Sequence, residues 1–332
     1  MSRIIKTVDT HTMGEPTRIV TGGIDKIPGE TMLEKRIYAI RHLDDIRTSL
    51  MHEPRGHKGM FGAIIVSPVV PDADLGVIFM DTDGYLDMCG HGLIGVVTAA
   101  VETGLLPQHD GIQSVKVETP AGVIDVTADI RDAKAESVSF QNVPSFLYQT
   151  DIPVQIEGRT PIAVDISYGG NYFALVDADE MDLVIDQENS DEIVAVGMAI
   201  LNEINNLVAI EHPQTGEPNR VKLVEFYTTP HSPEAHARNT VVFGNSQIDR
   251  SPCGTGTCAK MAYLYAKGQL GLNEVFVHEG IIGNCFKGRL LKAVNLDQIQ
   301  AVIPEITASA FVTGVHEFRI HPEDSLKHGF QL

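Results

Sequence analysis

Two copies of one short motif constrain the fold of this chain more than any other feature of its sequence. The first copy is Met88–Gly92 (MCGHG) and the second is Pro252–Gly256 (PCGTG). Each copy leads into an apolar run, and a glycine, Gly104 or Gly268, follows at the same distance from the cysteine. The pattern predicts a helix that begins at the cysteine and stops at a glycine in the C′ position.

The repeat extends well beyond the two motifs. Segment 9–20 reads as a strand, a glycine-containing turn and a second strand, and segment 165–176 reads the same way. The helical spacing of apolar residues over 34–50 is matched over 193–207. We therefore predict two pseudo-equivalent halves that face each other, each carrying one cysteine motif.

The composition is typical of a soluble globular protein. The chain has 332 residues, 43% of them hydrophobic and 21% charged, which suffices for one large domain or two of ordinary size. The formal net charge is -19 and no cluster of Lys and Arg offsets it, so nucleic acid and anionic membranes are poor partners. No apolar run approaches the roughly 18 to 20 residues of a membrane span.

Cysteine usage indicates a reducing compartment. The four cysteines are Cys89, Cys253, Cys258 and Cys285, too few and too scattered for a disulfide-stapled fold. The first residues carry no apolar signal segment. We expect a cytoplasmic protein with free thiols, in which Cys258 and Cys285 are inert.

A cysteine at a helix N-terminus is well placed for acid/base chemistry. Unpaired N–H groups and the positive end of the helix dipole favour the thiolate, which lowers the thiol pKa from its free value of roughly 8.5. The same N–H groups can hold a carboxylate. Two such helices aimed at one spot would place a substrate carboxylate between the helix ends and its α-carbon between the sulfurs of Cys89 and Cys253.

That arrangement suits removal of an α-proton from one face of a substrate and return of a proton to the other. One sulfur starts as thiolate and the other as thiol, and the roles exchange with the direction of reaction. Backbone N–H groups around Gly90-His91 and Gly254-Thr255 would stabilise the developing enediolate. The carboxylate of Asp249 could pair with the substrate's ammonium group.

Several motifs resemble the proline racemase family, which also contains 4-hydroxyproline 2-epimerases and trans-3-hydroxyproline dehydratases. They are DTHTMGEPTR, EPRGH, MCGHG, DRSPCGTGT and the KHGF tail, and they extend over essentially the whole chain. The resemblance implies an α+β fold similar to diaminopimelate epimerase, with two pseudo-symmetric halves that each wrap a β-sheet round a central helix. It places residues 1–125 plus 304–332 in the half with Cys89 and residues 126–303 in the half with Cys253.

Position by position, the resemblance makes Cys89 and Cys253 the catalytic acid/base pair. It assigns substrate contacts to five further positions: Gly90, His91, Asp249, Gly254 and Thr255. It implies an isomerase that racemises proline as a homodimer, with no cofactor and no metal. The dehydratases lack one of the two thiols, so the presence of both favours a racemase or epimerase. Leu93 and Cys258 stand where relatives commonly carry a small hydroxyl residue, and neither is given a chemical role.

Other interpretations of the same residues stay open. The motifs do not decide between proline and 4-hydroxyproline. Cys89, His91 and Cys253 are also the donors of a conceivable zinc site, and the two thiols could instead be structural or cycle as a redox dithiol. His91 could merely cap its helix, and Asp249 could merely bond its own turn. Five polar residues are expected to hold loops rather than react: His11, Glu15, Arg18, Arg55 and His57.

Overall fold

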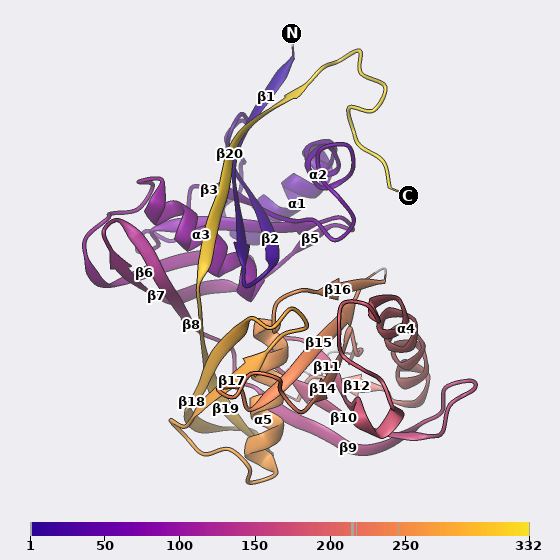
Figure 1. The fold of residues 1–332 in the computed structure, drawn as a ribbon. Coiled ribbons are helices and arrows are strands. Elements are labelled where there is room, and N and C mark those ends of the chain that lie inside the picture. Colours follow the sequence, from indigo (N-terminus) through magenta and orange to yellow (C-terminus); the bar gives the residue numbers. More distant parts are fainter. Residues whose placement is uncertain (1, 214–215, 217, 245, 332) are drawn as a thin grey trace. The chain divides into compact units, whose positions relative to one another are not determined.

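The computed structural model describes residues 2–213, 216, 218–244 and 246–331, and the chain divides into two compact units (Figure 1). Unit 1 comprises Met1–Phe140 and Ala308–Leu332, and unit 2 comprises Gln141–Thr307. The boundaries expected at residues 125 and 304 both fall inside strands. Residue 125 lies in β7 (Gly122–Arg131), which pairs with the strands on both sides, so the chain leaves unit 1 only after the next strand.

Unit 1 is a mixed sheet whose strand order brings the two ends of the chain together. Its neighbouring strands, in order, are β20 (Ala310–Ile320), β1 (Arg3–Thr12), β2 (Glu15–Gly22), β3 (Phe61–Val66), β4 (Leu75–Asp81), β6 (Gly111–Thr119), β7 and β8 (Lys134–Gln141). The pairs β2–β3 and β4–β6 are parallel and the others are antiparallel. The short β5 (Tyr85–Leu86) pairs with β4 and leads to the first cysteine motif.

The helix after the first motif forms the centre of unit 1. Helix α3 (Gly90–Glu102) is buried from Gly90 to Val101 and contacts β1, β2, β3 and β20. A helix that is apolar all round must be enclosed in this way. Cys89 is its N-cap, and Gly104, at φ +74°, follows the C-cap Thr103, so the predicted start and stop are confirmed.

The face of the unit 1 sheet away from α3 is covered by two short helices. They are α1 (Met32–His42) and α2 (Asp44–Met51), where one continuous helix over 34–50 was predicted. The break falls at Leu43, which serves as C-cap of α1 and N-cap of α2. Both helices pack their buried side chains on Ile5, Ile64 and Ile78 of the sheet.

Unit 2 repeats the same plan. Its strands, in order, are β9 (Phe146–Val154), β10 (Ile162–Tyr168), β11 (Tyr172–Asp177), β14 (Leu223–Thr228), β15 (Ala237–Phe243), β17 (Val275–Glu279), β18 (Cys285–Leu296) and β19 (Ile299–Ala308). The pairs β11–β14 and β15–β17 are parallel, at the positions where unit 1 has its parallel pairs. The short β16 (Gln247–Asp249) pairs with β15 as β5 pairs with β4.

The helices of unit 2 match those of unit 1. Helix α5 (Gly254–Ala266) has Cys253 as its N-cap and contacts β9, β10, β11 and β18. It ends in a Schellman motif, because Gln269 N donates to Leu264 O at 2.8 Å around Gly268, whose φ is +71°. Helix α4 (Ser190–Leu207) packs its apolar face against β14 and β15 on the other side of the sheet. The predicted α+β fold with two repeated halves is confirmed.

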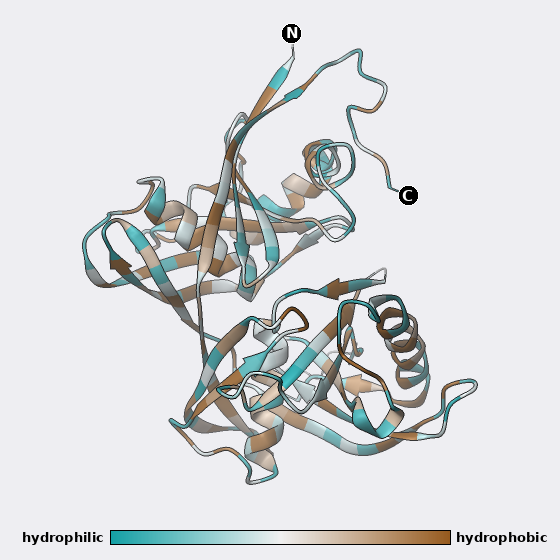
Figure 2. Ribbon diagram, in the orientation of Figure 1, coloured by the Kyte–Doolittle hydropathy of each residue, from teal (hydrophilic) through white to brown (hydrophobic). Residues whose placement is uncertain are grey.

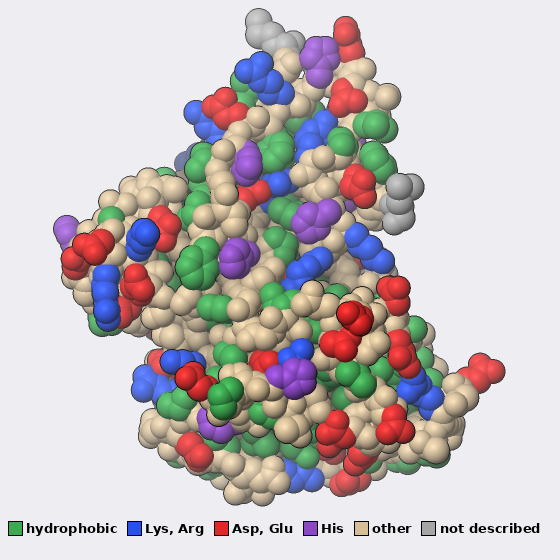
Figure 3. All heavy atoms as spheres, viewed as in Figure 1, with side chains coloured by type: hydrophobic (Ala, Val, Ile, Leu, Met, Phe, Trp, Pro, Cys, Tyr) green, Lys and Arg blue, Asp and Glu red, His purple; other side chains and the backbone are tan. Residues whose placement is uncertain are grey.

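The remaining elements are small, and the hydropathy of the chain follows the layers. A 3-10 turn (Asp179–Met181) and the two-residue strands β12 (Ile210–Glu211) and β13 (Pro218–Asn219) complete unit 2. Hydrophobic and hydrophilic residues alternate along the strands in Figure 2. On the face drawn in Figure 3, acidic side chains are spread over both units with basic ones among them. Within the described residues, no helix combines the length and apolarity that crossing a membrane requires.

Candidate active site

In unit 1, the Cys89 thiol lies at the mouth of α3 beside a histidine ring. Its Sγ is 3.2 Å from Nδ1 of His91, and the backbone at Cys89 is extended, with φ -148° and ψ 128°. The His91 ring packs edge-on against Phe61, with centroids 4.5 Å apart, and is only 8% exposed. Thr12 Oγ1 donates to the His91 carbonyl at 2.8 Å. Strand β1 thus fixes the turn that carries the thiol, its neighbouring ring and Gly90.

In unit 2, Cys253 itself caps the helix that it begins. Its φ is +61°, a left-handed conformation that is strained for a residue with a side chain, and this places Sγ 3.4 Å from the Gly256 N–H that it accepts. Thr255 Oγ1 lies 3.7 Å from the same sulfur. The two predicted thiols therefore share their place in the repeat but not their local backbone. Gly254 and Thr255 supply first-turn N–H groups, which have no acceptor within a helix.

Asp249 reaches the Cys253 turn through a serine that the sequence reasoning did not single out. Its Oδ1 accepts from both N and Oγ of Ser251, each at 2.8 Å. The Ser251 hydroxyl oxygen in turn accepts from Cys253 N at 3.1 Å. Asp249 is 6% exposed, and burial raises its pKa to about 6 against the opposing effect of the Ser251 bonds. The sequence pattern DRSPC carries this Asp-Ser-Cys chain at alternate positions.

Burial has the largest effect on the pKa of Cys253. Burial first, and the Asp249 carboxylate second, raise the pKa of the Cys253 thiol well above its ordinary value, although the Gly256 N–H opposes the rise. The N–H group at the helix N-terminus lowers the pKa of Cys253 as expected, but burial and Asp249 outweigh it, so the expected net lowering is not found. One N–H group at 3.4 Å does not compensate for removing a thiolate from water and placing it near a carboxylate. The raised pKa favours the thiol over the thiolate at Cys253.

Several polar residues near the motifs hold loops of unit 1. Arg18 Nη2 pairs with Asp9 Oδ2 at 2.8 Å, and its Nη1 donates to the carbonyls of Leu50 and Arg55. Arg55 Nη2 in turn pairs with Asp324 Oδ2 at 3.0 Å. His11 stacks on Phe311 and its Nδ1 accepts from Gly14 N, while His57 Nδ1 lies 2.9 Å from the Lys58 carbonyl.

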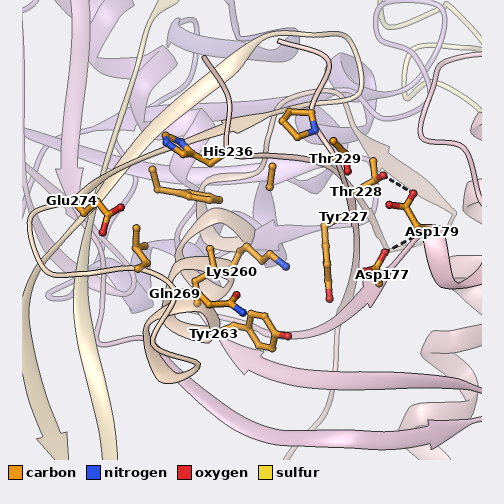
Figure 4. Close-up of a pocket in the computed structure, with 15 residues that line it drawn as sticks. Asp177, Asp179, Tyr227, Thr228, Thr229, His236, Lys260, Tyr263, Gln269 and Glu274 are labelled. Carbon is orange, nitrogen blue, oxygen red and sulfur yellow. Dashed lines mark hydrogen bonds between the residues drawn. The ribbon is translucent and has the colours of Figure 1, made fainter. Parts of the chain in front are cut away.

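Unit 2 also contains a pocket of about 580 Å³ that the sequence reasoning did not anticipate (Figure 4). The Lys260 side chain reaches between two tyrosines, with Nζ 2.9 Å from the ring centroid of Tyr227 and 4.8 Å from that of Tyr263. Burial lowers the pKa of Lys260 to about 8, and the nearby Glu225 carboxyl opposes this. No predicted site residue is among the described residues that line the pocket. The one sequence feature that pointed to this pocket is Lys260, a charged residue within the helix predicted after Cys253.

The described part of the chain contains no ready-made metal-binding site. There, no group of three or more His, Cys, Asp or Glu side chains is arranged to hold a metal ion. All four cysteines are free thiols.

Comparison with known proteins gives a consistent result over the full length. The sequence matches the family described as Proline racemase over residues 7–331. It is 47% identical over 331 residues to a proline racemase of Clostridioides difficile, covering 100% of this chain and 99% of that protein. A proline racemase of Acetoanaerobium sticklandii is 48% identical over 332 residues, with 100% and 99% covered. The crystal structure of a hydroxyproline epimerase from Agrobacterium vitis with bound trans-4-OH-L-proline matches with a TM-score of 0.88 at 31% identity, covering 99% of this chain and 96% of that one.

Proposed function

Because the chain belongs to the proline racemase family, we propose that it is an isomerase that interconverts L-proline and D-proline without a cofactor. The observation that carries the proposal is the paired placement of two thiols. Cys89 and Cys253 are the N-caps of the central helices of two units with the same strand order. A reaction that handles one proton on each face of an α-carbon needs two such groups.

In the proposed mechanism both thiols act on one substrate. The proline carboxylate accepts from first-turn N–H groups at Gly90 and His91 and at Gly254 and Thr255, which also bear the enediolate charge as it develops. In one direction the Cys89 thiolate removes the α-proton. The Cys253 thiol donates its proton to the opposite face of the same carbon and is left as thiolate.

The reverse direction requires Cys253 to start as thiolate, and the charge of Asp249 controls how readily this thiolate forms. The Asp249 carboxylate disfavours a charged sulfur, because it raises the pKa of Cys253. The ammonium of bound proline, paired with Asp249, would neutralise that carboxylate and lower the cost of the thiolate. Substrate binding would thus prepare Cys253 for either role, while the His91 ring, 3.2 Å from Cys89 Sγ, contacts the other sulfur.

Proton NMR of the purified protein in D₂O tests the proposal directly. L-proline should lose its α-proton signal while its optical rotation decays to zero. Pyrrole-2-carboxylate, a planar analogue of the enediolate, should inhibit the exchange and protect both Cys89 and Cys253 from alkylation. Chelator should leave the rate unchanged. An α-proton signal that persists through prolonged incubation with L-proline would sink the assignment.

A second candidate is 4-hydroxyproline 2-epimerase. The observation in its favour is the solved hydroxyproline epimerase with bound trans-4-OH-L-proline, whose fold matches over nearly the full chain. Running trans-4-hydroxy-L-proline beside L-proline in the same NMR experiment separates the two. Faster exchange with the hydroxylated substrate would move the assignment to the epimerase.

We further propose that the enzyme acts in the cytoplasm as a homodimer and has no nucleic-acid partner. The acidity of the chain and the family resemblance support this. Light scattering coupled to size-exclusion chromatography gives the mass in solution. A monomer at micromolar concentration would contradict the dimer.

A further inference from the structure

The two thiol-bearing turns rest on different chemical groups. Gly92 and Gly256 each stand three residues after their cysteine, at the same place in the first helical turn. A Cβ added to Gly92 would lie 2.8 Å from Cε1 of Phe61, whereas a Cβ added to Gly256 would lie 2.6 Å from Oε2 of Glu225. Beneath the Cys89 turn is an aromatic ring, and beneath the Cys253 turn is a carboxyl group.

Glu225 lies on strand β14, where it is fully buried among other titratable groups. It is 0% exposed, and neither of its carboxyl oxygens accepts a hydrogen bond of ordinary geometry from the described residues. Burial raises its pKa to about 7, against Lys260 and the Asn239 side chain. The titratable groups that face it from the packed elements are Lys260 and the thiols of Cys253 and Cys258 on α5, His278 on β17 and Asp249 on β16.

His278 is the buried group that lies beside the Glu225 carboxyl. Its Nδ1 is 3.0 Å from Thr257 Oγ1, and its Nε2 is 3.7 Å from Glu225 Oε1, too far for a hydrogen bond. Burial lowers the pKa of His278, which favours the neutral ring over a cation that could balance a carboxylate. Among the described residues, His278 Nε2 and both Glu225 carboxyl oxygens have no hydrogen-bond partner. A carboxylate enclosed there without a partner would be costly, which favours the protonated acid at Glu225.

Resting on the proposed role of Cys253, we propose that Glu225 is a positioning residue for this thiol: it is a protonated carboxylic acid in the resting enzyme and places a polar but uncharged group beneath the first turn of α5. Loss of the proton from Glu225 would place a negative charge against the turn that holds the Cys253 sulfur. Ionisation of Glu225 and of Cys253 therefore oppose each other. In the corresponding place beneath the Cys89 turn lie the rings of Phe61 and Phe79.

Thiol titration tests the inference without using catalysis. The rate of iodoacetamide alkylation at Cys253 is followed against pH by mass spectrometry in the wild-type protein and in the isosteric variant Glu225→Gln. Without an ionisable group beneath the turn, the pH profile of Cys253 alkylation should move to lower pH by about one unit. Alkylation of Cys89 in the same samples is the internal control and should keep its profile. Superimposable Cys253 profiles in the two proteins would overturn the proposal.

A second measurement reads the proton itself and guards against a variant that folds poorly. Infrared difference spectra across neutral pH should show a protonated carboxylic acid band in the wild type that Glu225→Gln lacks. Should Glu225→Gln not fold, His278→Gln should shift the same band, because it changes the polar group that lies 3.7 Å from the Glu225 carboxyl. A wild-type spectrum without such a band would place a carboxylate at Glu225 and overturn the inference. Neither readout depends on racemisation, so a failed NMR exchange and a failed infrared titration are distinguishable.

Discussion

Glu118 in unit 1 and Glu279 in unit 2 perform the same structural task at equivalent places in the repeat. Glu118 Oε2 accepts from the backbone N–H groups of Val69 and Val70, at 2.5 and 3.0 Å. Glu279 Oε2 accepts from those of His231 and Ser232, at 2.8 and 2.9 Å. Each glutamate stands on the strand that runs parallel to the second strand of a hairpin, and it clamps that hairpin's loop.

Removing the two clamps should cost unequal amounts of stability. Glu118→Ala leaves two backbone N–H groups without their acceptor and should lower the free energy of unfolding by about 2–3 kcal/mol. Glu279→Ala also strands the buried Arg238, whose Nη1 lies 2.6 Å from Glu279 Oε1, and should cost about 3–5 kcal/mol. Urea denaturation of each variant measures the difference. Equal losses would show that the Arg238 pair contributes nothing beyond the shared clamp.

Replacing either proposed catalytic thiol should remove racemisation and spare the fold. Cys89→Ser and Cys253→Ser exchange a thiol for a hydroxyl, which is far too weak an acid to give a base at neutral pH, so the rate should fall by about 10²- to 10⁴-fold or more. Cys285→Ser, at the start of β18, is the matched control and should keep its activity. Polarimetry and circular dichroism on the three variants separate chemistry from folding. Substantial activity in either of the first two would exclude the two-thiol mechanism.

Stability should depend on pH through Glu225. Its pKa is raised from 4.5 to about 7 by burial, so its contribution to stability is complete below about pH 4.5 and is lost as pH rises through 7. Relative to Glu225→Gln, the wild type should therefore lose roughly 2–3 kcal/mol between pH 4.5 and 8. Denaturant midpoints at several pH values give the curve. A difference between the two proteins that stays constant with pH would contradict this assignment.

The Asp9–Arg18 pair should contribute more than a surface pair of the same chemistry. Arg18→Met leaves the Asp9 carboxylate buried without its guanidinium and should destabilise the protein by about 3–5 kcal/mol. Arg131→Met breaks the surface pair between Arg131 and Asp129, in which the arginine side chain is 71% exposed. This loss should cost less than about 1 kcal/mol. Thermal unfolding of both variants provides the comparison. Similar melting temperatures would show that burial of the Asp9 pair carries no energetic weight.

The sequence predicted the features that local pattern determines. Helix starts at Cys89 and Cys253 and stops before Gly104 and Gly268 follow from a turn, an apolar run and a glycine, and the structure has them. The repeated order of strands follows in the same way. The sequence did not predict the break between α1 and α2 at Leu43, because the apolar spacing continues through this residue without proline or glycine.

What the sequence could not predict depends on contacts between distant elements. Glu225 and Lys260 are single charged residues in apolar segments, and only the packing of α5 against the sheet of unit 2 brings them close enough to affect each other's pKa. The raised pKa of Cys253 has the same origin, since burial outweighs the local effect of the helix N-terminus. Its left-handed backbone, at φ +61°, is likewise invisible in a motif that matches the extended Cys89.

The course of the chain through the two sheets sets the order in which they can be finished during synthesis. Strand β1 pairs along its whole length with β20, from Arg3 opposite Ile320 to Thr12 opposite Ala310. The sheet of unit 1 therefore lacks a strand until β20 has been synthesised, and every strand of unit 2 precedes β20 in the chain. The sheet of unit 2 can thus be completed before that of unit 1, although proteins generally fold from the N-terminal part first. A nascent chain carries an open β1 edge for most of its translation and must keep it from other chains.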